Sequence, residues 1–129
     1  MKYYVLKFED NYADEFDVSG IILTTENELN EFNDAIKWLK ENWIPKGENK
    51  YRGEIEVYFG TNEFLKYRDW KQVRNSFKEF EVSESVYLEM MEIFQSFHFG
   101  ESGVYWHVID SYEAGKNSYE YCEYNFKQA

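Results

Sequence analysis

The chain has 129 residues, of which 43% are hydrophobic and 21% aromatic, and a formal net charge of −11. This length suits one domain with one core, and the hydrophobic content excludes the disordered class. The negative charge argues against direct binding to nucleic acid, because affinity there comes largely from neutralising phosphates. An acidic surface instead favours basic partners.

The sequence gives no sign of secretion or of a membrane span. The opening stretch MKYYVLKFED lacks the apolar core of a signal peptide, and no apolar run approaches the length that crosses a bilayer. Cys122 is the single cysteine, so no intramolecular disulfide can form. We therefore expect a soluble, cytoplasmic protein with no membrane association.

The first part of the chain predicts a β-hairpin followed by a helix. Residues 3–8 and 15–25 are rich in aromatic and branched side chains, which is typical of strands, and Gly20 in the second indicates a bulge or a bend. Thr25 and Glu28 form a capping box that begins a helix. Apolar side chains then recur at helical spacing: Leu29, Phe32, Ile36, Leu39 and Trp43.

The middle of the chain predicts short elements. Residues 54–60 alternate between apolar and polar side chains, as in a half-buried strand, and residues 62–67 fit a further short strand. Residues 69–77 fit a short helix, and residues 78–82 fit another strand. The side chains of that helix expected to face inward are Trp70, Val73 and Phe77.

The last part predicts a helix and a terminal hairpin. Ser83 is placed to cap the helix, with Val82 and Tyr87 as a hydrophobic staple at its start. Residues 103–110 and 118–126 fit the two strands of the hairpin. The helix is expected to turn these side chains inward: Val86, Met90, Ile93, Phe94 and Phe97.

The combined order is roughly ββαβ(β)αβαββ, with about three helices. Strands and helices mix without a regular βαβ alternation, which predicts an α+β fold with a largely antiparallel sheet. We see no linker composition in the sequence, so we expect a single domain over residues 1–129.

No motif for catalysis, metal binding or a cofactor stands out. The acidic run after the first strand does not fit an EF-hand, although Asp10 and Asp14 would suit a shared cation. His98 and His107 lack zinc-site spacing, and we interpret them as a helix-end residue and a strand residue. Cys122 lies among Tyr and Glu, which disfavour a reactive thiolate. We therefore expect no catalytic residue, no metal and no cofactor.

Two acidic, aromatic segments are the candidates for recognising a partner, because carboxylates supply complementary charge and Tyr supplies rigid contact area. The alternative is ordinary polar decoration of a solvated loop and a hairpin. In the first segment, KFEDNYADEFDVSG, the candidates are Glu9, Asp10, Tyr12, Asp14, Glu15 and Asp17. In the second they are Asp110, Tyr112, Glu113, Tyr119, Glu120, Tyr121, Glu123 and Tyr124. The two segments would form one acidic face if the terminal strands were neighbours.

The charge is unevenly distributed along the chain. Residues 1–34 carry a net −7, residues 35–78 a net +4 and residues 79–129 a net −8. A thorough mimic of DNA would be acidic nearly throughout. This distribution fits better a protein that docks one acidic face.

In composition and in these acidic, Tyr-rich segments, the chain resembles small anti-defence inhibitors of phages and mobile elements, such as anti-CRISPR and DNA-mimic anti-restriction proteins. That resemblance implies a non-enzymatic inhibitor in the bacterial host cytoplasm, whose partner is a basic nuclease or nuclease complex. The chain also resembles immunity proteins, which implies one cognate toxin. The remaining alternatives are an uncharacterised cellular domain, enzymatic or structural, and a homodimer that uses the aromatic surplus itself.

Replacing Asp10, Asp14, Glu15 and Asp17 with Asn and Ser removes four carboxylates from the first segment. We expect the variant to bind its basic target more weakly, because complementary charge speeds association and fixes the orientation of the partners. Inhibition of the target and its affinity at two salt concentrations check this. Unchanged inhibition would remove the first segment from the binding surface.

Overall fold

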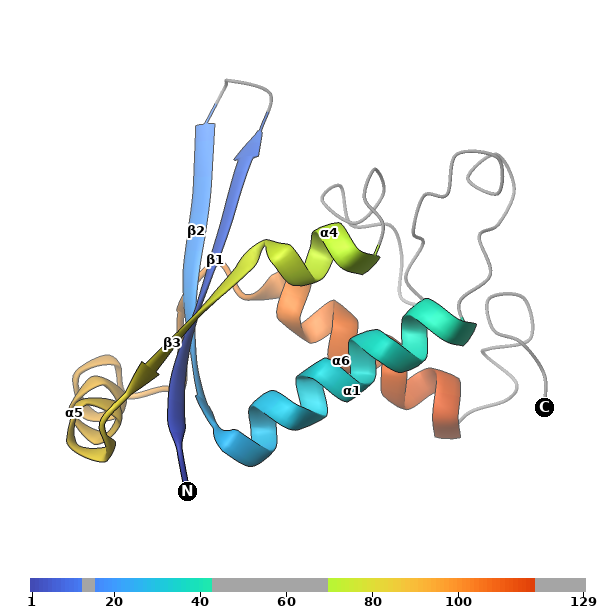
Figure 1. Cartoon of the computed structure of the whole chain (residues 1–129). Helices are drawn as coiled ribbons and strands as arrows, with labels where there is room; N and C mark the ends of the chain where they lie inside the picture. Colours follow the sequence, from blue (N-terminus) through green and yellow to red (C-terminus); the bar gives the residue numbers. More distant parts are fainter. Residues whose placement is uncertain (13–15, 43–69, 118–129) are drawn as a thin grey trace. The chain divides into compact units, whose positions relative to one another are not determined.

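Four antiparallel strands form a sheet in the order β3-β1-β2-β4 (Figure 1). The computed structural model describes residues 1–12, 16–42 and 70–117. The strands are β1 (Tyr3–Tyr12), β2 (Phe16–Thr25), β3 (Phe77–Val82) and β4 (His98–Gly100). The helices are α1 (Glu26–Asn42), α4 (Trp70–Asn75), α5 (Glu84–Phe94) and α6 (Gly103–Asn117). The predicted α+β class and the antiparallel sheet are confirmed.

The chain divides into two compact units. The sheet unit contains Met1–Glu31 and Asn75–Ser102, which hold the four strands, the start of α1 and α5. The helical unit contains Phe32–Arg74 and Gly103–Ala129, which hold the rest of α1, α4 and α6. The single domain over residues 1–129 stays a prediction.

The predicted hairpin forms, and its first strand continues to Tyr12 instead of ending at residue 8, while the second strand begins at Phe16 close to its predicted start. β1 and β2 pair continuously from Tyr3 opposite Thr25 to Tyr12 opposite Phe16. The first acidic segment therefore belongs mainly to paired strands and not to a loop. The ladder tolerates the acidic residues because none lies directly opposite another: Glu9 faces Ser19, Asp10 faces Val18 and Asp17 faces Asn11.

Gly20 marks a close approach between strands, which corrects the predicted bulge or bend. It lies in regular register opposite Phe8 on one side and opposite Gly100 on the other. A Cβ atom at Gly20 would clash with the backbone of Glu101. The Glu101 amide donates to the Ser19 carbonyl at 3.1 Å. Glycine is needed here because the backbone of Glu101, directly after β4, occupies the space of a side chain.

α5 covers one face of the sheet, where it builds a core with β1 and β2 (Figure 1). Val5, Leu23 and Tyr87 are the buried centre of this core. The Tyr87 ring lies 4.7 Å from the Tyr3 ring, centroid to centroid. Partly buried side chains pack around that centre: Tyr3, Ile21, Val82, Met90, Met91, Phe94 and Phe97.

The other residues of the same strands are buried as well. Leu6 and Ile22 are fully buried, and they alternate along their strands with Val5 and Leu23, so their side chains point to the opposite face of the sheet. Phe8 and Phe77 pair across β1 and β3 with ring centroids 5.1 Å apart. The central strands β1 and β2 therefore need apolar side chains on both faces.

Local sequence signals predicted the starts of α1 and α5 correctly. The Thr25 amide donates to the Glu28 carboxylate at 3.0 Å, and the Glu28 amide donates to the Thr25 hydroxyl at 3.3 Å, which completes the predicted capping box. At α5 the Ser83 hydroxyl accepts from the Val86 amide at 3.2 Å. The inward stripe of α1 is buried at Leu29, Phe32, Ile36 and Leu39, whereas Trp43 lies outside the described residues.

The predicted inward side of α5 is partly wrong. Ile93 is 74% exposed and Val86 is 40% exposed, while Tyr87 is buried. Seven of the eleven residues of α5 are apolar, so the sequence allows several inward stripes. The structure buries the stripe that brings Tyr87 against Tyr3.

Residues 103–110 form the first part of α6, which corrects the predicted strand. Val104, Tyr105 and Val108 are buried, and this spacing is helical because alternation would bury every second residue. In the helical unit, the Tyr105 ring stacks on Phe32 at 5.2 Å, and the Tyr112 ring meets Trp38 edge-on at 5.7 Å. The described residues thus contain four helices, one more than expected.

The two histidines exchange their predicted settings. His98 lies in β4 opposite Ile22, since α5 ends at Phe94 and the left-handed Gln95 (φ 52°) forms its C-cap. His107 lies in α6. The short helix is confirmed as Trp70–Asn75 with Trp70 and Val73 buried, and the strand before α5 is confirmed as well. Phe77, predicted on that helix, is instead buried as the first residue of β3. The predicted strands at 54–60, 62–67 and 118–126 fall outside the described residues.

Replacing Gly20 with Ala should destabilise the protein by about 1–3 kcal/mol, because the added methyl group must displace the Glu101 backbone. Urea unfolding followed by circular dichroism measures this difference. The matched control is Ser19→Ala at the exposed neighbouring position, which should stay within about 0.5 kcal/mol of the parent. Equal stability of the two variants would show that β4 does not need glycine opposite it.

Candidate functional site

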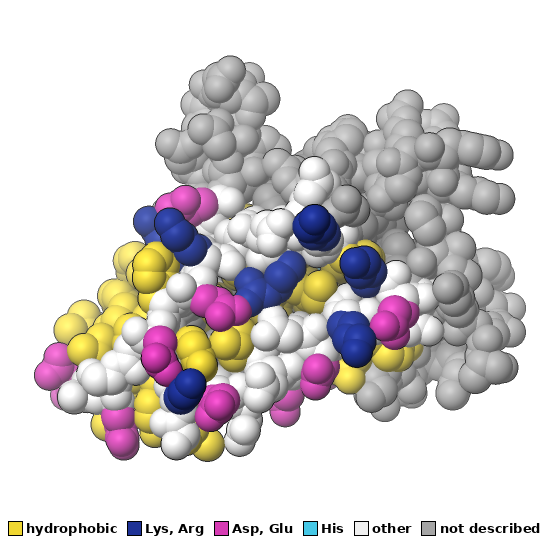
Figure 2. All heavy atoms as spheres, in the orientation of Figure 1, with side chains coloured by type: hydrophobic (Ala, Val, Ile, Leu, Met, Phe, Trp, Pro, Cys, Tyr) yellow, Lys and Arg dark blue, Asp and Glu magenta, His cyan; other side chains and the backbone are white. Residues whose placement is uncertain are grey.

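The outer side of α5 exposes apolar and acidic side chains together. Leu88 is 54% exposed and Ile93 is 74% exposed, and Val86 is 40% exposed. The charged side chains over α5 are acidic and lie beside hydrophobic ones (Figure 2). We call this set the α5 surface: Glu84, Val86, Leu88, Glu89, Glu92 and Ile93.

The burial of Tyr87 explains why these side chains face solvent. Tyr87, Met90, Met91 and Phe94 follow the spacing of one helix face and pack on the sheet. Burial raises the pKa of the Tyr87 hydroxyl, and the nearby Glu28 and Tyr3 raise it further. The neutral ring thus suits its buried setting.

The carboxylates of the α5 surface lack ion-pair partners among the described residues. Glu84, Glu89 and Glu92 are exposed, and the ion pairs of the described sheet unit join other residues. From Glu79 to Glu113 the sequence contains eight Asp and Glu residues and no Lys or Arg. A partner that brings cations to this helix therefore meets carboxylates that no Lys or Arg in residues 1–12, 16–42 and 70–117 pairs with.

Negative charge is concentrated in the sheet unit. Its described residues contain three Lys and twelve Asp or Glu, whereas those of the helical unit contain five Lys or Arg and four Asp or Glu. Two of the three Lys are already paired, Lys2 with Glu81 at 3.7 Å and Lys7 with Glu9 at 2.7 Å. The acidic residues of β1, β2, β3 and α5 thus belong to one unit, whereas Asp110 and Glu113 on α6 belong to the helical unit.

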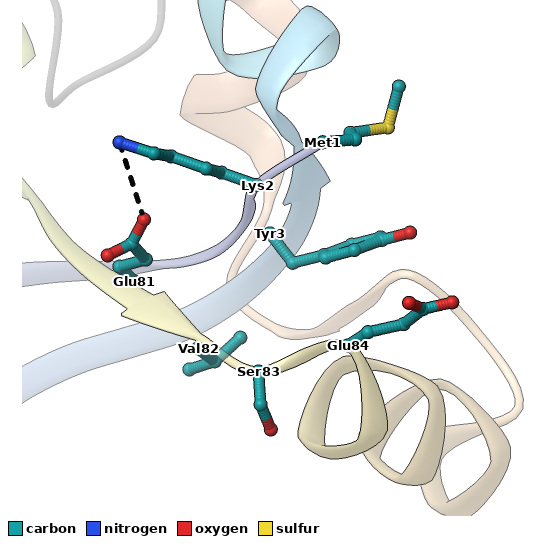
Figure 3. Close-up of a pocket in the computed structure, with 7 residues that line it drawn as sticks. All are labelled: Met1, Lys2, Tyr3, Glu81, Val82, Ser83 and Glu84. Carbon is teal, nitrogen blue, oxygen red and sulfur yellow. Dashed lines mark ion pairs between the residues drawn. The ribbon is translucent and has the colours of Figure 1, made fainter.

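A depression of about 410 Å³ lies beside the start of α5 (Figure 3). Lys2 reaches toward Glu81 on one side of it, whereas Tyr3 and Glu84 extend away from that ion pair (Figure 3). Its wide opening and its mixture of Lys and Glu side chains select neither an anion nor a cation. The lining residues are Met1, Lys2, Tyr3, Glu81, Val82, Ser83 and Glu84.

Of the residues predicted to contact a partner in the first acidic segment, Glu9 is the one whose side chain the structure describes. It is exposed on β1, and its carboxylate accepts a hydrogen bond from Lys7. That bond, together with the charges of Lys7 and Lys78, lowers the pKa of Glu9. Lys7 therefore keeps Glu9 ionised. It also neutralises part of the negative charge of Glu9, which weakens the attraction of Glu9 for a cationic partner.

Backbone register places three further predicted residues near the far end of the hairpin. Asp10 lies opposite Val18, Tyr12 opposite Phe16 and Asp17 opposite Asn11. The remaining predicted residues lie outside the described part of the chain: Asp14, Glu15, Tyr119, Glu120, Tyr121, Glu123 and Tyr124.

The second acidic segment begins on a helix and not on a hairpin strand. Asp110 and Glu113 are exposed on α6, whereas Tyr112 is half-buried and packs against Trp38. In the described residues these positions belong to the helical unit, while the first segment belongs to the sheet unit. The strand pairing that would join the segments into one sheet face is therefore not formed by residues 103–117.

Comparisons with known proteins assign no family to the chain. No protein-family model, no curated protein and no solved structure matches it. Within residues 1–12, 16–42 and 70–117, no group of three His, Cys, Asp or Glu residues is placed to hold a metal ion. No helix in that same part of the chain has the length and apolar character to cross a membrane.

Sequence reasoning missed the α5 surface because it assigned Val86 and Ile93 to the core. One signal was available. A helix face buries about three or four residues in two turns, and α5 has seven apolar residues in eleven positions. Some of them had to remain exposed, and the absence of Lys and Arg on this helix made the exposed side acidic.

Replacing Lys7 with Gln should raise the pKa of Glu9, because the variant loses the hydrogen bond and the charge that lower it. A carboxylate with a lowered pKa stabilises the fold above its ordinary pKa, and this contribution is lost as pH falls through the folded-state value. The variant should therefore lose less stability than the parent on acidification. Carbon-detected NMR titration of Glu9 measures the shift. Lys37→Gln on α1 is the control, and an equal shift there would exclude Lys7 as the cause.

Proposed function

We propose that this protein is a non-enzymatic inhibitor that docks an acidic and apolar face of its sheet unit on a basic protein. The observation that supports this function best is the α5 surface, where exposed Leu88 and Ile93 lie among carboxylates that have no ion-pair partner in the described part of the chain. Exposed apolar side chains grouped in this way are typical of a contact surface. The surrounding charge selects cationic partners.

The proposed partner is a nuclease or a nuclease complex of a bacterial defence system, in the host cytoplasm. Enzymes that act on DNA or RNA carry Lys and Arg to neutralise phosphates. An acidic protein held over such a surface excludes the nucleic acid without binding it. In this mechanism the carboxylates speed association, and the apolar side chains slow dissociation.

The acidic hairpin would widen the same contact. Glu9, Asp10 and Asp17 lie on β1 and β2 of the sheet unit, which also carries α5. A partner that bridges them would need a basic surface wider than one helix. The first segment therefore stays in the proposal as a second contact.

The second candidate is an immunity protein that neutralises a cognate toxin. The exposure of Ile93 favours it, because a large apolar anchor supports a tight complex with little salt dependence. Salt sensitivity separates the two candidates, since attraction between exposed opposite charges is largely screened beyond about 10 Å at 0.1 M salt.

Immobilised protein should retain nucleases from lysates of bacteria that carry defence systems and release them along a salt gradient. Mass spectrometry of the fractions identifies the proteins. Each retained nuclease is then purified and assayed for DNA or RNA cleavage, and we expect cleavage to fall in proportion to the inhibitor added.

Two controls make this result specific. An unrelated protein of similar net charge on a second column removes partners that bind any acidic surface. Duplex DNA added to the lysate should compete, because it occupies the same cationic groove. A column that retains no nuclease at low salt, or retained nucleases that cleave at full rate, would contradict the inhibitor proposal.

A further inference from the structure

We infer that α5 is the docking helix, and that its occupant is a protein surface with an apolar cleft flanked by a row of Lys or Arg. This inference rests on the proposed function and names the element and the chemistry that would carry it. It starts from the order of side chains around α5.

The outer side of α5 carries two parallel stripes. Val86 and Ile93 lie seven residues apart, which is two helical turns, so both exposed side chains are on the same side of the helix, while Met90 between them packs toward the sheet. Ser85, Glu89 and Glu92 each lie one position before these residues and form the neighbouring stripe. An apolar row thus runs directly beside an acidic row.

The apolar row extends beyond the end of the helix. Phe99, on the edge strand β4, is 58% exposed, and its ring stacks on Phe94 at 4.9 Å. Phe94 is the last residue of α5. A partner lying along the helix would therefore find a further aromatic contact at its C-terminal end.

Charge decides between the possible occupants. A second copy of the chain docked helix to helix would bring the same carboxylates together, and no Lys or Arg lies between Glu79 and Glu113 to offset them. Nucleic acid would meet the carboxylates with its phosphates. A cationic protein surface neutralises the acidic row while its cleft covers Ile93 and Val86.

The test uses a synthetic helical peptide of leucine and lysine as a minimal cationic and apolar surface. Titration into isotopically labelled protein should shift amide signals of residues 84–99 most strongly. A peptide with glutamate in place of lysine should cause no shift. The inference is overturned if the largest shifts fall outside residues 84–99, or if the glutamate peptide binds equally well.

Two variants resolve the two stripes. Ile93→Ser should weaken peptide binding about tenfold through loss of an apolar anchor. E89Q combined with E92Q should weaken it about fivefold at low salt and much less at high salt. The charge control is E31Q combined with D34N, which removes two exposed carboxylates from α1. Equal weakening by this control would overturn the assignment to α5.

Two further results keep this inference separate from the proposed function. If the variants with substitutions in α5 still capture and inhibit the nuclease, the assignment of α5 as the docking helix is overturned, and the inhibitor proposal is not. If the column captures no nuclease but the peptide still binds at α5, the inhibitor proposal is overturned and the docking helix is supported. A concentration-dependent dimer that Ile93→Ser dissociates would show that a second copy is the occupant.

Discussion

The packing of Tyr87 against Tyr3 decides how this protein presents itself to solvent. The two rings lie 4.7 Å apart, and Tyr87 is buried in the core that joins α5 to the sheet. An aromatic side chain contributes more to burial than a Val or an Ile of the same helix. α5 is therefore rotated so that Val86 and Ile93 remain outside, and the carboxylates of the helix lie beside them.

This rotation joins two properties that composition alone leaves separate. The chain has many apolar and many acidic residues, but apolar side chains normally fill the core while charged ones cover the surface. On α5 both kinds occupy the outer side. Such a surface offers steering through charge and residence through apolar contact, which is why an inhibitor of a basic protein is the function that these observations favour.

Prediction from the sequence succeeded where the cause is local and was less complete elsewhere. The caps at Thr25 and Ser83 were correct because each depends on a few adjacent residues. The hairpin was predicted correctly, but its first strand was predicted to end too early. Of the candidate site, Glu9 was expected in a loop after the first strand but lies within β1, and its ion pair with Lys7 was not foreseen. Asp110 and Glu113 lie on a helix. The prediction of a strand there was wrong because GVYWHVID fits alternation and helical spacing equally well.

The sequence by itself determined the fold class, the starts of α1 and α5 and the excess of negative charge, because these follow from local pattern and composition. Only the tertiary structure decided which side of α5 is buried, why Gly20 must be glycine and where β3 lies. Each of these depends on what a residue meets from a distant part of the chain: Tyr3 for Tyr87, Glu101 for Gly20 and β1 for β3. Periodicity gives the faces of an element, but the neighbour that it contacts selects the face that is buried.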